Sequence, residues 1–164
     1  MSDTSTSLPQ EAHRLFAEYF GKIERCIGLL STEQIWWRPN PTCTSVGNIL
    51  LHLCGNLSQW VLAGLGGIPF ERHRHEEFAA VGGQDGSTLL GRLGEVVSAC
   101  RDVTSDLPEE TLGQVFVIQG MTSTGFGVLL HAVEHMSYHT GQIIYIAKQL
   151  VGEQVEVEFY PLLR

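Results

Sequence analysis

The stretch STGFGVLLHAVEHMSYHTGQIIYIAKQL, residues 123–150, carries a continuous helical pattern. Its apolar residues recur at intervals that place them on one face of an α-helix. That apolar surface comprises Val128, Ala132, Met136, Ile143, Ile146 and Leu150. We therefore predict one long amphipathic helix, opened by the Thr/Ser/Thr cluster at residues 122–124. Within it, Gly141 is expected to allow close packing of a neighbouring helix.

Three further segments show the same periodicity. We expect them to form helices over about residues 9–30, 46–63 and 87–107. Ser45 is a plausible N-cap for the second helix, and Asp85 or Ser87 for the third. Four amphipathic helices with little strand signal predict an all-α four-helix bundle.

A long connection, residues 64–86, separates the second and third helices and is rich in glycine and charge. We expect a loop here, with Arg72–His75 forming a solvated surface or a subunit contact. Two short alternating segments, residues 114–118 and 154–160, are possible marginal strands that could pair with each other. The core of the predicted bundle does not depend on them.

Length and composition are those of a folded globular chain. The sequence has 164 residues, 43% hydrophobic and 17% charged, so we expect a single domain over residues 1–164. The formal net charge is −8 and the basic residues are scattered, which argues against a nucleic-acid partner. Signal-peptide and membrane-spanning patterns are absent from the sequence, so we expect a cytoplasmic protein without a membrane partner. The four cysteines form no CxxC pair and are expected to be reduced, mostly core thiols.

Three histidines follow one another at intervals of four residues on the long helix: His131, His135 and His139. Residues four apart are offset by about 40° around a helix, so the three form one ridge, with Gln142 in the same arc. The ridge lies on or beside the core-facing side, where an imidazole without hydrogen-bond partners is costly. A metal site and a set of structural histidines both explain this spacing. Glu134 precedes His135, so the HExxH motif of zinc proteases is absent.

A third ligand would have to come from another helix. His52, in NILLHLCGN (residues 48–56), lies beside Ile49 and Asn56 on the flank of the second helix's apolar stripe. From this position it can face across a bundle. A single histidine at such an edge is more often structural, but together with the pair on the long helix it favours a metal site.

Three segments together resemble the DinB-like and YfiT-like superfamily of metal-dependent proteins. They are TSVGNILLHLCGNLSQWVLAGLGG (44–67), RHRHEEF (72–78) and HAVEHMSYHTGQIIYIAKQL (131–150). The resemblance implies a four-helix bundle, usually a homodimer, that holds a divalent ion on one histidine of helix two and an H-x-x-x-H pair of helix four. Carried over, the metal ligands are His52, His135 and His139. His131 becomes a residue of the surrounding pocket or a support for a ligand.

The resemblance also implies an enzyme that acts on a small molecule. Similar proteins include thiol-dependent S-transferases and a mycothiol-dependent isomerase, while for others only hydrolysis has been suggested. We expect a divalent ion, zinc or nickel, to activate a water or a low-molecular-weight thiol co-substrate. Glu134, Gln142 and Asn56 are candidates for orienting ligands or moving protons. The alternative is a non-catalytic dimeric bundle that the metal stabilises or that binds a small ligand.

Overall fold

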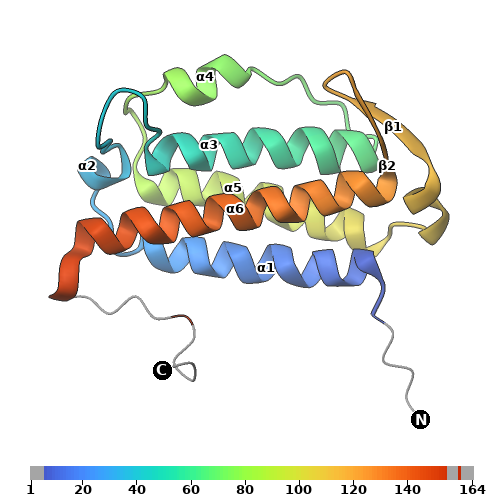
Figure 1. Cartoon of the computed structure of the whole chain (residues 1–164), viewed down its shortest axis with the longest axis horizontal. Helices are drawn as coiled ribbons and strands as arrows, with labels where there is room; N and C mark the ends of the chain where they lie inside the picture. Colours follow the sequence, from blue (N-terminus) through green and yellow to red (C-terminus); the bar gives the residue numbers. More distant parts are fainter. Residues whose placement is uncertain (1–5, 155–158, 160–164) are drawn as a thin grey trace, which may run out of the picture.

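The chain folds into a bundle of four long helices (Figure 1). The computed structural model describes residues 6–154 and Phe159. α1 packs against α5 and α6, and α3 packs against the same two helices, so the four surround one core. This confirms the predicted all-α four-helix bundle. The bundle helices are α1 (Leu8–Ile27), α3 (Val46–Leu57), α5 (Gly86–Ser105) and α6 (Gly125–Val151).

Shorter elements connect the bundle helices. A π-helix, η1, continues α3 without a break, and the short helix α4 lies over α3 (Figure 1). Among the described residues, no helix combines the length and the apolarity needed to cross a membrane. The shorter elements are α2 (Thr32–Ile35), η1 (Ser58–Leu65), α4 (Arg74–Ala79), the 3₁₀ helices η2 (Glu109–Gly113) and η3 (Gly152–Gln154), and strands β1 (Val115–Ile118) and β2 (Met121–Thr124).

Side-chain caps explain where the bundle helices begin. Ser45 caps α3 as predicted, in a reciprocal pair with Asn48: each side chain accepts a hydrogen bond from the other's backbone N–H, both at 3.1 Å. Asp85, not Ser87, caps α5 by accepting from the backbone N–H of Thr88 at 2.8 Å. These caps satisfy N–H groups that have no partner inside the helix.

Large apolar side chains from all four helices fill the core. Burial of this kind is the main favourable term in folding. The largest fully buried side chains are Phe16, Ile23, Ile35, Ile49, Leu50, Leu53, Leu57, Leu89, Leu93, Leu129, Met136 and Ile143. All four cysteines are free thiols, and Cys26, Cys54 and Cys100 are buried, as expected from the sequence. Burial raises the pKa of the Cys26 and Cys54 thiols to about 11, so both stay protonated at neutral pH.

The start of α6 differs from the prediction. Residues 121–124 form β2, which pairs with β1 in an antiparallel hairpin, so α6 begins at Gly125 with Thr124 as its N-cap. The two-residue loop, Gln119 and Gly120, has φ values of 55° and 75°, the left-handed pair that matches the twist of a tight hairpin. β1 therefore confirms one predicted strand but pairs with a segment that we expected to open the helix. The other predicted strand, residues 154–160, falls almost entirely outside the described residues.

The connection between the second and third bundle helices is more ordered than predicted. Its first residues belong to η1, where the chain follows wider π-helical turns instead of the α-helix expected up to residue 63. Its centre contains α4, which packs against α3. In a segment expected to be a loop, α4 thus brings the side chains of Glu77 and Phe78 next to His52 of α3.

Candidate metal centre

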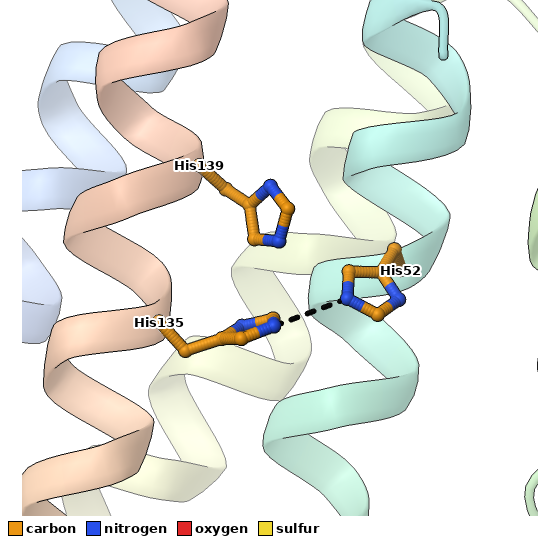
Figure 2. A group of neighbouring side chains, drawn as sticks. All are labelled: His52, His135 and His139. Carbon is orange, nitrogen blue, oxygen red and sulfur yellow. Dashed lines mark hydrogen bonds between the residues drawn. The ribbon is translucent and has the colours of Figure 1, made fainter. Parts of the chain in front are cut away.

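α3 and α6 bring three histidine rings together. The two helices run in opposite directions, and Figure 2 shows His52 of α3 facing His135 and His139 of α6. One ring nitrogen of each residue lies within 4.8 Å of the other two. The Nε2 atoms of His52 and His135 are 3.1 Å apart. His52 is buried and the other two rings are half-buried, so the cluster lies at the edge of the core.

A hydrogen bond to Gln142 sets the orientation of the His139 ring. Nδ1 of His139 lies 2.7 Å from the amide oxygen of Gln142, one helical turn further along α6. Because an amide oxygen only accepts, Nδ1 carries the ring proton. This leaves a lone pair on Nε2, the nitrogen that points toward the other two rings (Figure 2).

A hydrogen bond to the buried carboxylate of Glu77 sets the orientation of the His52 ring. Nδ1 of His52 lies 2.9 Å from Oε2 of Glu77, and both side chains are less than a tenth exposed. Arg72 donates to both oxygens of this carboxylate, through Nε at 2.7 Å and Nη2 at 2.8 Å. Nη2 also lies 3.1 Å from His52 Nδ1. Because an ionised carboxylate only accepts hydrogen bonds, the 2.9 Å contact with Glu77 requires a proton on Nδ1, and Nδ1–H donates to the carboxylate. Nε2 of His52 is left with a lone pair.

The charges of these groups follow from their surroundings. Burial alone would raise the pKa of the Glu77 carboxyl, but hydrogen bonds from Arg72 and His52 outweigh it and hold that pKa below its usual value. Burial, reinforced by the neighbouring histidines, lowers the pKa of His135 to about 3. Burial also lowers the pKa of His139. At neutral pH the Glu77 carboxylate is therefore ionised, and His135 and His139 are neutral, the form in which histidine binds metals.

This donor set fits a divalent ion. Ring nitrogens of three imidazoles converge on one space, and the Nε2 atoms of His52 and His135, 3.1 Å apart, repel each other unless a proton or a cation lies between them. A proton on His135 Nε2 can lie between only one pair of ring nitrogens, whereas a divalent ion can bind all three nitrogens at once. His135 Nδ1 is buried without a hydrogen-bond partner among the described residues. His135 is therefore the least constrained of the three rings.

The remaining predicted site residues lie at different distances from the cluster. His131 is half-buried, its ring centroid 4.1 Å from that of Trp60 and 5.4 Å from that of His135, and it is outside the group of three. Burial lowers its pKa. Asn56 is buried on α3, and its Oδ1 has no hydrogen-bond partner in the described part of the chain. Glu134 is exposed. Of the three candidates for orienting ligands, Gln142 is the one bonded to a histidine of the cluster.

Glu77 is not among the site residues predicted from the sequence, and Arg72 was expected on a solvated surface or in a subunit contact. Both side chains are buried, because the guanidinium and the carboxylate pair with each other and so avoid an unpaired buried charge. His73, Arg74 and His75 are exposed, as predicted. The one hint to Glu77 in the sequence is that it lies in RHRHEEF, a segment that carries the family resemblance. This segment has no periodic pattern from which a contact between Glu77 and His52 could be predicted.

A pocket of about 380 Å³ opens beside the cluster at Gln142. None of its lining residues carries a charge, although the chain as a whole is acidic. The lining combines aromatic and aliphatic surface with hydroxyl and amide groups, as small-molecule pockets commonly do. The residues are Trp37, Pro39, Thr42, Cys43, Thr44, Ile49, Gln142, Tyr145, Ile146 and Gln149.

The chain matches a family model and several solved structures. The model described as protein of unknown function (DUF1572) matches residues 3–159. A conserved protein from Enterococcus faecalis superposes with a TM-score of 0.76 and 19% identity, covering 91% of this chain and all of that one. DinB-like proteins from Bacillus cereus and Bacillus subtilis both give a TM-score of 0.69, at 16% and 17% identity. They cover 89% and 92% of this chain and 93% and 96% of their own. No curated protein sequence matches the chain.

Proposed function

Because the chain belongs to the DUF1572 family and has the DinB-like fold predicted from its sequence, we propose that it is a metal-dependent enzyme acting on a small molecule. His52, His135 and His139 hold one divalent ion, and the reaction is an S-transfer or a hydrolysis. The observation that carries the proposal is the convergence of three ring nitrogens within 4.8 Å. Fixed tautomers of His52 and His139 support it further, because each ring directs a lone pair into the same space.

A divalent ion on three imidazoles keeps coordination positions open and lowers the pKa of a water or thiol ligand toward neutrality. The residues of the chain supply the remaining features of the site. Glu77 and Gln142 orient two of the three rings by accepting hydrogen bonds from their Nδ1–H groups. Burial keeps His135 neutral at physiological pH, so no proton has to be removed from it before a metal is bound.

We infer that zinc or nickel is the metal and that a low-molecular-weight thiol is a co-substrate. Imidazole ligands suit both metals as well as copper and iron, so elemental analysis of the purified protein identifies the ion. The pocket beside Gln142 supports a small substrate with an uncharged, partly apolar portion, because its lining is uncharged and includes Trp37, Tyr145 and Ile146.

Activity measurements on metal-loaded protein test the proposal. Zinc-loaded and nickel-loaded chains are assayed with thiols and electrophilic acceptors and, separately, with hydrolytic substrates. We expect turnover by the wild-type chain and its loss in the His135→Ala variant. His131→Ala, which removes a neighbouring histidine outside the group of three, should retain metal-dependent turnover. Equal activity of the wild-type and His135→Ala chains would rule out a metal mechanism.

One observation favours the non-catalytic alternative. Glu77 is the only carboxylate among the described contacts of the three rings, and it is committed to Arg72 and His52, which leaves no free carboxylate base at the cluster. In this alternative the ion stabilises the bundle by joining α3 to α6. The result expected from it is a metal-dependent rise in melting temperature without turnover on any thiol or hydrolytic substrate.

We further propose that the chain forms a homodimer. Support comes from the exposed side of α6, where Phe126, Leu130, Tyr138 and Tyr145 lie within one arc of the helix, each with about half or more of its surface accessible. Exposed apolar stripes of this kind are typical of protein–protein contacts. Light scattering on the purified chain should give twice the monomer mass, and Leu130→Glu together with Tyr138→Glu should reduce it to the monomer mass.

A further inference from the structure

A buried ion pair in the connection between α3 and α5 lies directly behind a proposed metal ligand. The side chains of Arg72 and Glu77 are 5% and 9% exposed, which is unusual for charged residues. Their two-pronged contact, Nε to Oε1 and Nη2 to Oε2, fixes the plane of the carboxylate. Nη1 of Arg72 also donates to Gln59 at 3.1 Å, which fixes the guanidinium in turn.

The backbone of α3 leaves space for this carboxylate at Gly55. A Cβ added to Gly55 would lie 2.1 Å from Oε1 of Glu77 and 3.0 Å from Nε of Arg72. Any other residue at position 55 would therefore displace the ion pair. Because Gly55 has no Cβ, the Glu77 carboxylate can lie against the backbone of α3. There it is within hydrogen-bond distance of His52, which precedes Gly55 by almost one turn.

Polar contacts also fasten the end of α4 to the start of α3. The amide nitrogen of Asn48 donates to the backbone carbonyls of Glu77 at 2.9 Å and Ala80 at 2.8 Å. Arg38 donates to the same carbonyl of Ala80 at 2.8 Å. α4 is thus held both by its side chain at position 77 and by its own backbone. The Glu77 carboxylate has little freedom to move away from His52.

We propose that Glu77, held by Arg72 and by the space at Gly55, is a positioning residue for the metal ligand His52. By accepting a hydrogen bond from Nδ1–H it maintains the tautomer in which the unprotonated Nε2 faces His135 and His139, and so it sets the affinity of the site for its ion. The proposal rests on the proposed metal site. Partners of this kind on metal-bound histidines change metal affinity by about 10–100-fold when they are removed.

Glu77→Gln is the direct test, and Glu76→Gln is its matched control. Glu76 lies next to Glu77 on the same helix but is exposed. Glutamine keeps the size of the side chain, but its oxygen can pair with Arg72 while its NH₂ group turns to His52. The His52 proton then moves to Nε2, where it blocks the metal-facing nitrogen. Zinc affinity is measured by competition with a chromophoric chelator. We expect Glu77→Gln to bind about 10–100-fold more weakly and Glu76→Gln to bind like wild type.

A second readout separates positioning from a general loss of structure. Long-range ¹H–¹⁵N spectra of the metal-free protein report the tautomer of each histidine. We expect the Nδ1–H form of His52 in the wild-type and Glu76→Gln chains and the Nε2–H form in Glu77→Gln. Gly55→Ala keeps the carboxylate but displaces it, so it should also weaken zinc binding.

The outcomes distinguish this proposal from the one it rests on. If wild type binds zinc and Glu77→Gln binds it equally well with an unchanged His52 tautomer, the positioning role is wrong while the metal site stands. The same conclusion follows if Glu77→Gln only lowers the melting temperature of the metal-free protein. A wild-type chain that binds neither zinc nor nickel would overturn the proposed function together with this proposal.

Discussion

At the scale of single residues, the site depends on histidines that stay neutral. A protonated imidazole at the edge of a core lacks much of the hydration it would have in water, which is why burial lowers the pKa values of His131, His135 and His139. The hydrogen bonds to Glu77 and Gln142 then decide which nitrogen of His52 and His139 carries the remaining proton. Burial thus keeps His135 and His139 neutral, and hydrogen bonds fix the tautomers of His52 and His139, which is the form in which a histidine can bind a metal ion.

These lowered pKa values predict acid sensitivity of the metal-free chain. His135 titrates near 6.5 when unfolded and near 3 when folded, so between these values the unfolded chain binds more protons. The free energy of unfolding should therefore fall as the pH drops from about 6.5 toward 3, by at most about 1.4 kcal/mol per pH unit for each such histidine. Urea denaturation of metal-free protein at pH 7, 6 and 5 measures this slope.

The His135→Asn variant is the control for the acid-sensitivity prediction. It removes the histidine whose pKa is lowered to about 3, so its free energy of unfolding should depend less steeply on pH between 7 and 5 than that of wild type. Identical slopes for the two chains would contradict the account of His135 as a buried neutral imidazole.

The sequence identified the histidines and one residue that orients a ring, Gln142, but not Glu77. His131, His135 and His139 share a helix, so their common direction follows from spacing alone, and the resemblance then selected His52, His135 and His139. Glu77 lies 25 residues from His52 along the chain, in a segment whose glycines and charges obscure any helical period. A contact made through space by a short helix leaves no such pattern. Only the folded chain shows that this carboxylate is buried beside His52.

At the scale of elements, the residues that begin two of the bundle helices were predicted correctly from the sequence, whereas the hairpin was not. Ser45 and Asp85 are short polar residues directly before apolar periodic segments, and both cap helices. β2, by contrast, consists largely of threonine and serine, residues that also open helices, so its sequence is compatible with either structure. Its pairing with β1 decides between them. The π-helical turns of η1 likewise have the composition of an ordinary helix.

Two glycines of α6 have opposite roles, contrary to the expectation for Gly141. A Cβ on Gly125 would lie 2.2 Å from the carbonyl oxygen of Thr111, a backbone atom that cannot easily move. Gly141 is exposed, and a Cβ there would meet no atom within 4 Å, so the predicted close helix packing is wrong. Gly125 is required by the close contact between α6 and η2. Gly141 has no such contact, and glycine in the middle of a helix lowers the stability of that helix.

We therefore predict opposite effects of the same substitution. Gly125→Ala should destabilise the chain by about 1–3 kcal/mol, because the added methyl group forces the start of α6 away from η2. Gly141→Ala should stabilise it by about 0.5–1 kcal/mol, since alanine favours the helical conformation. Chemical denaturation of both variants measures the two changes. A Gly125→Ala chain as stable as Gly141→Ala would show that the contact between α6 and η2 contributes nothing.

At the scale of the whole molecule, the proposed ion joins two helices that are distant in sequence. His52 is 83 residues from His135, so binding one ion to both links α3 to α6 across the bundle. Any ligand that binds only the folded state stabilises it, by about 2.7 kcal/mol when its concentration is 100 times the dissociation constant. For a chain of this size, each kcal/mol raises the melting temperature by about 2–4 °C.

Removal of metal should accordingly lower the melting temperature by several degrees. We expect chelator-treated wild type to unfold at lower temperature than protein with excess zinc, and re-addition of zinc to restore it. His135→Ala should melt at the same temperature with and without zinc. A zinc-dependent rise of equal size in His135→Ala would mean that the ion binds elsewhere on the chain.

The overall architecture followed from the sequence because four apolar stripes have few ways to be buried together. Each of α1, α3, α5 and α6 presents its predicted apolar face to one core, and side-chain caps mark where each helix begins. The homodimer remains a prediction, since the arrangement of one chain does not identify what covers an exposed stripe on α6.

The binding stoichiometry of zinc tests the central claim, a three-histidine metal site, most directly. Wild type and the variants His52→Ala, His135→Ala, His139→Ala and His131→Ala are dialysed to equilibrium against buffered zinc, and the bound metal is measured by elemental analysis. We predict one ion per chain for wild type and for His131→Ala, and a large loss in each of the other three. A wild-type chain without bound zinc, or a loss in His131→Ala as large as in the other variants, would contradict it.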